Sequence, residues 1–185
     1  MRTLTEQLTQ YAAYHRDKRN IATHFVGIPM IVIAIAMLLG RPMWTIAMMP
    51  FTLSPAHVLF AATTVYYLAL DVSAGLMMAV LSALCLMLGQ WLAAQSTPIW
   101  LSAGLGLFIV GWVFQFVGHI AYEHRKPAFV DDLIGLAIGP LFLLAEALFG
   151  LGWRPALRAA IEAQAGASRI NRSGKPADQP HAQRH

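Results

Sequence analysis

Long apolar runs, separated by short polar segments, make up most of the chain. Four of these runs approach or reach the length of about 20 residues that a helix needs to cross a bilayer. They cover residues 21–39, 56–70, 76–94 and 99–121. The pattern predicts an all-α fold, a polytopic helical membrane protein with about four transmembrane helices.

Two further segments differ from this pattern. From Leu4 to His15, apolar positions recur at helical spacing with polar residues between them, which indicates an N-terminal amphipathic helix lying at the membrane interface. A last apolar run, residues 133–151, contains Pro140 in its middle and Glu146 in its second half. Proline removes a helical hydrogen bond, and a carboxylate at the bilayer centre costs about 2.5–3.5 kcal/mol. We therefore expect this run to be re-entrant or kinked, with Glu146 facing protein.

Shorter signals mark the connections. Residues 43–53 are apolar but too short to cross, which indicates a connecting or re-entrant segment. Ser54-Pro55 is a helix start signal, with proline at the first helical position. The first apolar run is longer than the core of a signal peptide and lacks a small-residue cleavage site, so we expect it to remain as an anchor.

Composition agrees with a membrane protein. Hydrophobic residues make up 57% of the 185 positions and charged residues 12%, and no Asp, Glu, Lys or Arg occurs between Val72 and Tyr122. The formal net charge is +4, but the basic residues stand at the ends of apolar runs and in the tail, a distribution that favours anionic headgroups over nucleic acid. The single cysteine, Cys85, excludes an intramolecular disulfide.

Charge also predicts an orientation. Arg16, Lys18 and Arg19 precede the first run, and Arg125 and Lys126 follow the fourth. Four crossings place both basic clusters on the same, cytoplasmic, face. The basic residues after the last run stay on that face only if the run does not cross, which favours the re-entrant interpretation. We expect the inner membrane for a bacterial protein and the endoplasmic reticulum for a eukaryotic one.

The polar residues at this face carry the candidate chemistry. His119 and Glu123 are four positions apart, so on an α-helix they share a face and can hold one metal ion or one proton. His124 joins them only if the helix ends before Pro127. His15 and His24 are nine positions apart and meet only if the chain bends between them.

The predicted topology brings together His15, Asn20, His24, His119, Glu123 and His124. Several imidazoles beside a carboxylate suit a divalent transition metal such as Fe, Zn, Mn or Cu, and three protein ligands with open positions are typical of non-haem iron oxygenases. Interfacial histidines, each satisfied by water or headgroups, are the alternative. No Gly-rich phosphate loop, His-Glu-x-x-His, Gly-x-Ser-x-Gly or cysteine pair is present.

The chain resembles the membrane 2-hydroxy fatty acid dioxygenase family over roughly residues 4–154. Two histidine-bearing blocks and three weaker signals carry the resemblance. They are Tyr14-His15 with Asn20, His24 and Gly27-Ile28-Pro29; Gln115-Phe116 with Gly118-His119, Glu123 and Pro127-Ala128; Tyr67 to Asp71 with Ala74-Gly75; Pro140; and Glu146.

The resemblance implies an Fe(II)-dependent enzyme of endomembranes that shortens 2-hydroxy fatty acids by one carbon, the reaction called α-oxidation, with O2 and without 2-oxoglutarate. It implies that His15, His24 and His119 bind the metal, and that Glu123 is a ligand or accepts a hydrogen bond from one. His124 has no counterpart in the pattern. We expect one membrane-embedded catalytic domain over residues 1–160 and a disordered basic tail over residues 161–185.

The substrate would be a long-chain 2-hydroxy fatty acid whose carboxylate and hydroxyl chelate the metal, while its tail lies among apolar helices. Arg16, Asn20, Arg125 and Lys126 are the candidate residues for its polar head, and Glu146 has no assigned role. The pattern is compatible with a monomer or a homo-oligomer. A non-catalytic membrane scaffold, a small proton-coupled transporter that uses Glu146 or Asp71, and a bis-histidine haem protein are the rival interpretations.

Overall fold

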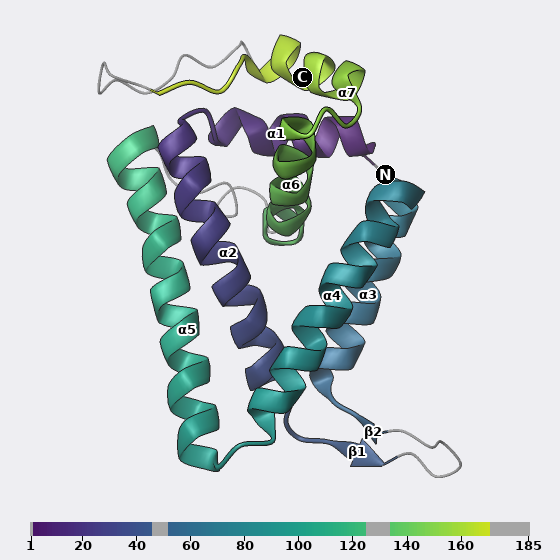
Figure 1. The fold of residues 1–185 in the computed structure, drawn as a ribbon, viewed down its shortest axis with the longest axis vertical. Helices are drawn as coiled ribbons and strands as arrows, with labels where there is room; N and C mark the ends of the chain where they lie inside the picture. Colours follow the sequence, from purple (N-terminus) through teal and green to yellow (C-terminus); the bar gives the residue numbers. More distant parts are fainter. Residues whose placement is uncertain (1, 46–51, 125–133, 171–185) are drawn as a thin grey trace. The chain divides into compact units, whose positions relative to one another are not determined.

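The computed structural model describes residues 2–45, 52–124 and 134–170 (Figure 1). The chain divides into two compact units, one formed by residues 1–26 with 113–185 and the other by residues 27–112. In chain order the elements are α1 (Leu4–Tyr14), α2 (Lys18–Leu38), β1 (Trp44–Thr45), β2 (Thr52–Leu53), α3 (Pro55–Leu70), α4 (Val72–Ala93), α5 (Thr97–Val117), the π-helix η1 (Gly118–Glu123), α6 (Ile134–Gly150) and α7 (Pro155–Ala165). The predicted all-α class is confirmed.

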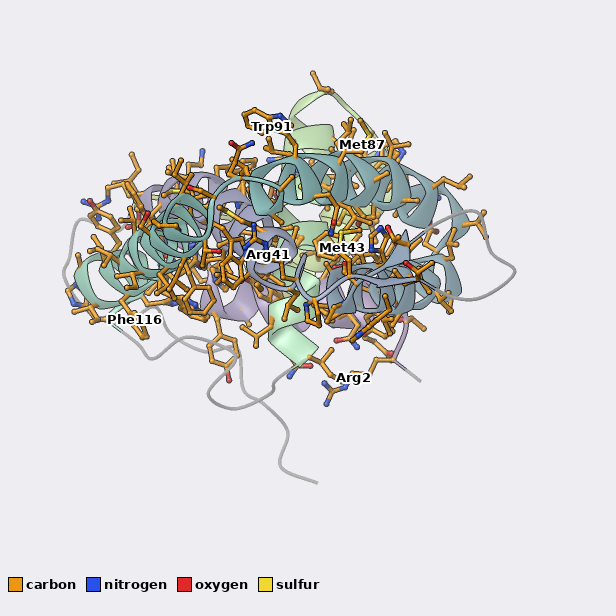
Figure 2. All side chains as sticks on the ribbon, turned by 90° about the horizontal axis from the view of Figure 1, so that it is seen from below. Arg2, Arg41, Met43, Met87, Trp91 and Phe116 are labelled. Carbon is orange, nitrogen blue, oxygen red and sulfur yellow. The ribbon has the colours of Figure 1, made fainter. Side chains whose placement is uncertain are left out.

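In the part of the chain that the structure describes, three helices are long and apolar enough to cross a membrane: α2, α4, and α5 continued by η1. The helix α3 is apolar but has 16 residues, fewer than the expected second span needs. The pair α6 and α7 is bent by 118° and is either a broken span or a re-entrant segment. Side chains such as Met87 and Trp91, 69% and 63% exposed, point away from α4 (Figure 2). Such apolar, outward-facing helices are those of a membrane protein.

Small residues bring the helices of the second unit close together. Asp71 alone joins α3 to α4, and its carboxylate accepts a hydrogen bond from the Ala74 N–H at 2.9 Å, which caps α4. A Cβ atom at Gly89 would lie 2.5 Å from the Cβ of Ala36, so α4 and α2 touch where glycine allows it. This unit is held by close backbone packing.

The segment before α3 is a connection. Its strands β1 and β2 pair antiparallel, Trp44 with Leu53, so the re-entrant alternative for residues 43–53 is not what the described part shows; residues 46–51 lie outside the described residues. Ser54 then caps α3 as expected: the Nδ1 atom of His57 lies 2.8 Å from the Ser54 hydroxyl oxygen and accepts the Ser54 N–H at 3.1 Å.

In the first unit, α1 begins at a capping box formed by Thr3 and Glu6. The apolar positions that predicted this helix are buried: Leu4, Leu8, Tyr11 and Ala12. They pack against α6 and α7 (Figure 1). The expected interfacial helix therefore has its apolar face covered by protein, because two later helices of the chain supply the partner surface.

The C-terminal region departs from the expected tail. Ile161 and Ala165 are buried in α7, which packs on α1. After it, residues 166–170, here called the C-terminal strap, run beside the loop that follows α1. The Arg169 N–H donates to the Arg16 carbonyl at 2.9 Å, and the Lys18 N–H donates to the Arg169 carbonyl at 3.2 Å. The disordered tail was expected over residues 161–185; residues 161–165 belong to α7, residues 166–170 form the strap, and residues 171–185 lie outside the described residues.

Arg41 is expected to stabilise the second unit. Its guanidinium donates to the carbonyls of Ala93 and Gln95, at 2.7 and 2.5 Å, and lies over the Trp100 ring. It thereby satisfies one carbonyl at the end of α4 and one in the turn that follows, neither of which has a helical partner. Arg41→Ala should lower the free energy of unfolding by about 1.5–3 kcal/mol. Thermal unfolding in detergent measures this.

Arg41→Lys should recover little of that loss, because an ammonium group cannot span both carbonyls as a planar guanidinium does. Metal binding by folded protein should not change in either variant, since all candidate ligands lie in the other unit. A lysine variant as stable as the parent would show that charge alone is sufficient there.

Candidate metal centre

A break between α1 and α2 brings two histidines together. Residues 15–17 are not helical, and the His15 N–H closes α1 by donating to the Ala12 carbonyl at 3.0 Å. The bend that the nine-residue spacing required is therefore present. The rings of His15 and His24 lie 4.5 Å apart between centroids and meet nearly edge to face. Their Nε2 atoms are 3.0 Å apart.

Backbone carbonyls determine the tautomer of both rings. The Nδ1 atom of His15 lies 2.7 Å from the Tyr11 carbonyl, and that of His24 lies 2.9 Å from the Asn20 carbonyl. A carbonyl only accepts, so each Nδ1 carries the hydrogen and each neutral ring presents a bare lone pair at Nε2. Two lone pairs that face each other at 3.0 Å repel unless a proton or a metal ion lies between them.

His119, from η1, completes the cluster. Its ring centroid lies 4.8 Å from that of His15 and 5.0 Å from that of His24. One ring nitrogen from each histidine lies within 4.8 Å of the other two, and all three side chains are buried. Among the described residues, the Nδ1 atom of His119 has no hydrogen-bond partner.

The electrostatic setting favours neutral imidazoles. Burial, followed by the neighbouring His24 and His119, holds the pKa of His15 well below its usual value. A neutral imidazole whose Nδ1–H is tied to a carbonyl is the usual form of a histidine metal ligand. The donor set and its orphaned buried nitrogen fit a divalent transition metal.

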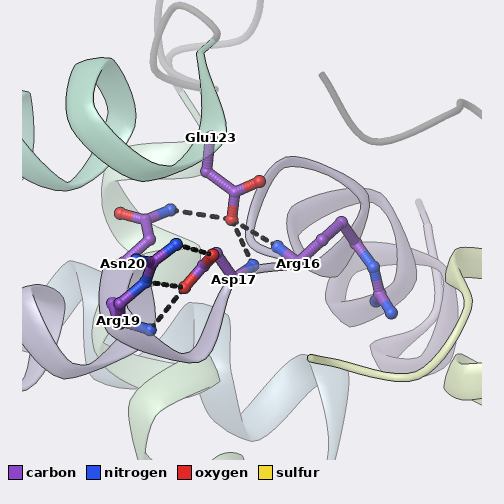
Figure 3. A network of polar contacts seen from close by, with 5 residues as sticks. All are labelled: Arg16, Asp17, Arg19, Asn20 and Glu123. Carbon is purple, nitrogen blue, oxygen red and sulfur yellow. Dashed lines mark hydrogen bonds and ion pairs between the residues drawn. The ribbon is translucent and has the colours of Figure 1, made fainter. Parts of the chain in front are cut away.

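Glu123 is buried beside the cluster, and its carboxylate supports the chain that carries His15 (Figure 3). Its Oε1 atom accepts the backbone N–H groups of Arg16 and Asp17, at 2.5 and 2.7 Å, and the Asn20 side-chain amide at 3.2 Å. An anion placed before the first turn of α2 is also favoured by the dipole of that helix. The structure thus gives this carboxylate three donors to bind.

Asn20 and Gly118 join α2 to η1. Asn20 is fully buried, donates to Glu123 and offers its carbonyl to His24. A Cβ atom at Gly118 would overlap the Asn20 amide oxygen and the Thr23 hydroxyl, so glycine is what allows this approach. Asn20, which was expected near the substrate head, therefore contacts both His24 and Glu123.

The remaining expected residues lie elsewhere. His124 is exposed, in a left-handed conformation with φ of 53°, and stands outside the three-histidine cluster. Glu146 and Arg16 line a hollow beside His15. Arg125 and Lys126 lie outside the described residues.

Asp17 was not among the residues predicted from the sequence. This buried side chain forms an ion pair with Arg19 at 2.8 Å, and its own N–H donates to Glu123 (Figure 3). Arg19 in turn lies over the Tyr122 ring, 4.6 Å from its centroid. The position of Asp17 just before α2, which begins at Lys18, is the signal that could have found it, because aspartate caps helices.

A profile of the family described as "2-hydroxy-palmitic acid dioxygenase Mpo1-like" matches residues 1–151. The chain belongs to this family. It is also 34% identical, over 160 residues, to the 2-hydroxy-palmitic acid dioxygenase MPO1 of Saccharomyces cerevisiae, an alignment that covers 86% of this chain and 87% of that protein. No solved structure matches. The resemblance inferred from the histidine blocks is confirmed, and all three clustered histidines of this family member lie within the matched residues.

Metal retention tests the cluster. His15→Ala, His24→Ala and His119→Ala should each remove most of the bound metal, because two histidines hold a divalent ion far more weakly than three. Elemental analysis of the protein purified in detergent and dialysed measures this. His124→Ala is the matched control and should keep its metal. Full occupancy in all three cluster variants would place the site elsewhere.

Two substitutions of Glu123 distinguish a carboxylate that supports the backbone from one that binds the metal. Glu123→Gln retains an oxygen that can accept the two backbone N–H groups, so it should lower metal affinity by about tenfold, whereas Glu123→Ala should lower it by about a hundredfold. Competition with a chelator gives the affinities. If Gln and Ala abolished binding equally, the carboxylate would be a ligand and its supporting role would be secondary.

Proposed function

We propose that this protein is an Fe(II)-dependent dioxygenase that converts a 2-hydroxy fatty acid to the fatty acid one carbon shorter. The observation that carries the proposal is the cluster of His15, His24 and His119, with ring nitrogens converging in a buried site. Family membership supports the choice of reaction, since the yeast relative is named a 2-hydroxy-palmitic acid dioxygenase.

The three histidines would hold the iron, because buried and converging ring nitrogens suit a divalent transition metal. When bound, Fe(II) supplies redox chemistry toward O2 and a Lewis acid to which a carboxylate and its neighbouring hydroxyl can chelate. Tyr11 and Asn20 orient the ligand rings through their carbonyls. Glu123 holds the loop that sets the position of His15.

The reaction balances without a further co-substrate. R–CH(OH)–COOH and one O2 together contain the atoms of R–COOH, CO2 and H2O. The C1–C2 bond breaks, C2 rises to the oxidation level of a carboxylic acid, and C1 leaves as CO2. Those changes withdraw four electrons, the number that the full reduction of O2 takes up. No 2-oxoglutarate is therefore needed.

The protein's basic residues would receive the substrate's carboxylate. Arg16 adjoins the cluster through His15 and carries a half-buried guanidinium. Arg125 and Lys126 follow η1 in the sequence and are further candidates. Each CH2 of the acyl tail that leaves water adds about 0.8 kcal/mol, so affinity should rise with chain length.

We place the site at the cytoplasmic face. Arg16, Lys18 and Arg19 stand between the histidines and at the start of α2, which is long enough to span. Basic residues beside a membrane span favour the cytoplasmic side. The substrate would then reach the site from the bilayer that holds the helices.

Substrate selectivity tests the proposal. With Fe(II) and O2, a long-chain 2-hydroxy acid should yield the acid one carbon shorter, while the unsubstituted acid of equal length should be inert. The reason is that only the hydroxy acid can chelate one metal ion through a carboxylate oxygen together with the neighbouring hydroxyl. Mass spectrometry of the extracted lipid measures both products.

The control is the His119→Ala protein loaded with the same iron concentration, which should give no shortened acid. Similar turnover of both acids would disprove the chelate model. Absence of shortened product with iron demonstrably bound would disprove the proposed reaction.

A further inference from the structure

A small hollow, with about 10 Å³ of room for the centre of a water-sized sphere and partly open to solvent, lies beside the histidine cluster in the first unit. Its wall includes His15 and Arg16 from the loop after α1, Glu146 from α6, and Arg158 and Glu162 from α7. The strap closes it further through Gly166 and Ser168. The hollow therefore connects a cluster ligand with two guanidinium groups.

Arg16 is the better buried of these two cations. Its side chain extends away from the Glu123 network (Figure 3) and donates to the Gly166 carbonyl. In the described part of the chain, no carboxylate lies within ion-pair distance of that guanidinium. A guanidinium has five N–H donors, and this one is half-buried with a neutral carbonyl as its partner, so it can bind an anion.

Arg158 adds a second, more exposed cation. Its Nε atom donates to Glu162 at 2.9 Å, one helical turn later on α7. Such exposed pairs on a helix contribute little, so an incoming carboxylate can replace Glu162 as the partner. Arg158 lies beyond residue 151, where the match to the family profile ends. Its contribution to the site is therefore not implied by the family match.

We propose that this hollow binds the carboxylate of the acid substrate, and that Arg158 of α7 acts with Arg16 as its partner. This assignment rests on the proposed function, and it makes α7 and the strap part of the substrate site. The two guanidiniums approach from different elements, so a carboxylate between them would also hold α7 against the loop that carries His15.

Two acidic side chains also face the hollow. The proposal therefore predicts that removing an acidic residue and removing a basic residue change acid binding in opposite directions. Glu162 competes with the substrate for Arg158, and Glu146 repels it. Removing the Glu162 charge should therefore strengthen acid binding, whereas removing Arg158 should weaken it. A purely structural ion pair instead predicts a change in the same direction for both variants, because losing either partner would then disturb α7 alike.

The experiment measures binding without turnover. Full-length, metal-free protein in detergent is titrated with an unsubstituted long-chain fatty acid and with the primary alcohol of the same length, by displacement of a fluorescent fatty acid. Arg158→Ala should bind the acid about tenfold more weakly and the alcohol unchanged. Glu162→Gln should bind the acid about two- to fivefold more tightly.

Arg169→Ala is the matched control. It removes one positive charge from the strap, which acts on Arg16 only through space, keeps the backbone N–H that bonds to the Arg16 carbonyl, and its side chain does not line the hollow. It should therefore lower the preference for acid over alcohol much less than Arg158→Ala does. Thermal unfolding of each variant shows whether α7 remains in place.

An unchanged acid-to-alcohol ratio in Arg158→Ala, or a shift in the same direction in Arg158→Ala and Glu162→Gln, would overturn the assignment. Failure of the proposed reaction is seen separately, as absence of shortened acid from iron-loaded parent protein. If acid binding weakens in Arg158→Ala and tightens in Glu162→Gln while alcohol binding is unchanged, the assignment of the hollow as the carboxylate site is supported, regardless of the result of the activity assay.

Discussion

Two imidazole nitrogens held 3.0 Å apart impose the constraint on which the histidine-bearing unit depends. Their lone pairs repel, so the surrounding structure must hold the rings in place. Carbonyls of Tyr11 and Asn20 fix the rings from behind, and the buried carboxylate of Glu123 fixes the backbone between them. A site held this way is organised before any ion arrives, which reduces the entropy lost when one binds.

Glu123 also shows how a buried charge is made tolerable. An isolated carboxylate in a dry interior is strongly disfavoured, but this one accepts two backbone N–H groups and one amide N–H. Those N–H groups precede α2 and have no partner within a helix. The same contacts therefore give hydrogen-bond acceptors to the N–H groups that precede the helix and offset the free-energy cost of burying the carboxylate. Asp17 and Arg19 form a second, adjacent pair at the same turn.

Much of this could be predicted from the sequence, because it depends on local periodicity. The apolar runs located α2, α4 and α5, and the spacing of His15 and His24 required the observed bend. What failed depends on contacts between distant segments. The cover over α1 comes from α6 and α7, and the partners of Glu123 lie more than 100 positions earlier, at Arg16 and Asp17. No pattern within one helix reveals such pairings.

The π-helical geometry of η1 could also not be predicted from the sequence. The spacing of His119 and Glu123 predicted an α-helix, on which both side chains would share a face and could hold one metal ion or one proton. The segment is a π-helix, and it begins at Gly118, the residue that lets it approach α2. Wider turns of this kind often occur at functional sites, but nothing in the spacing of polar residues announces one.

The division of the chain has a consequence for biosynthesis. The histidine-bearing unit is built from the first 26 residues and from those after residue 112, with the whole second unit made in between. While a ribosome is still producing that middle part, His15 and His24 lack their third partner. The histidine cluster can therefore form only after the middle helices have been made, and a product truncated before His119 would lack one of its three rings.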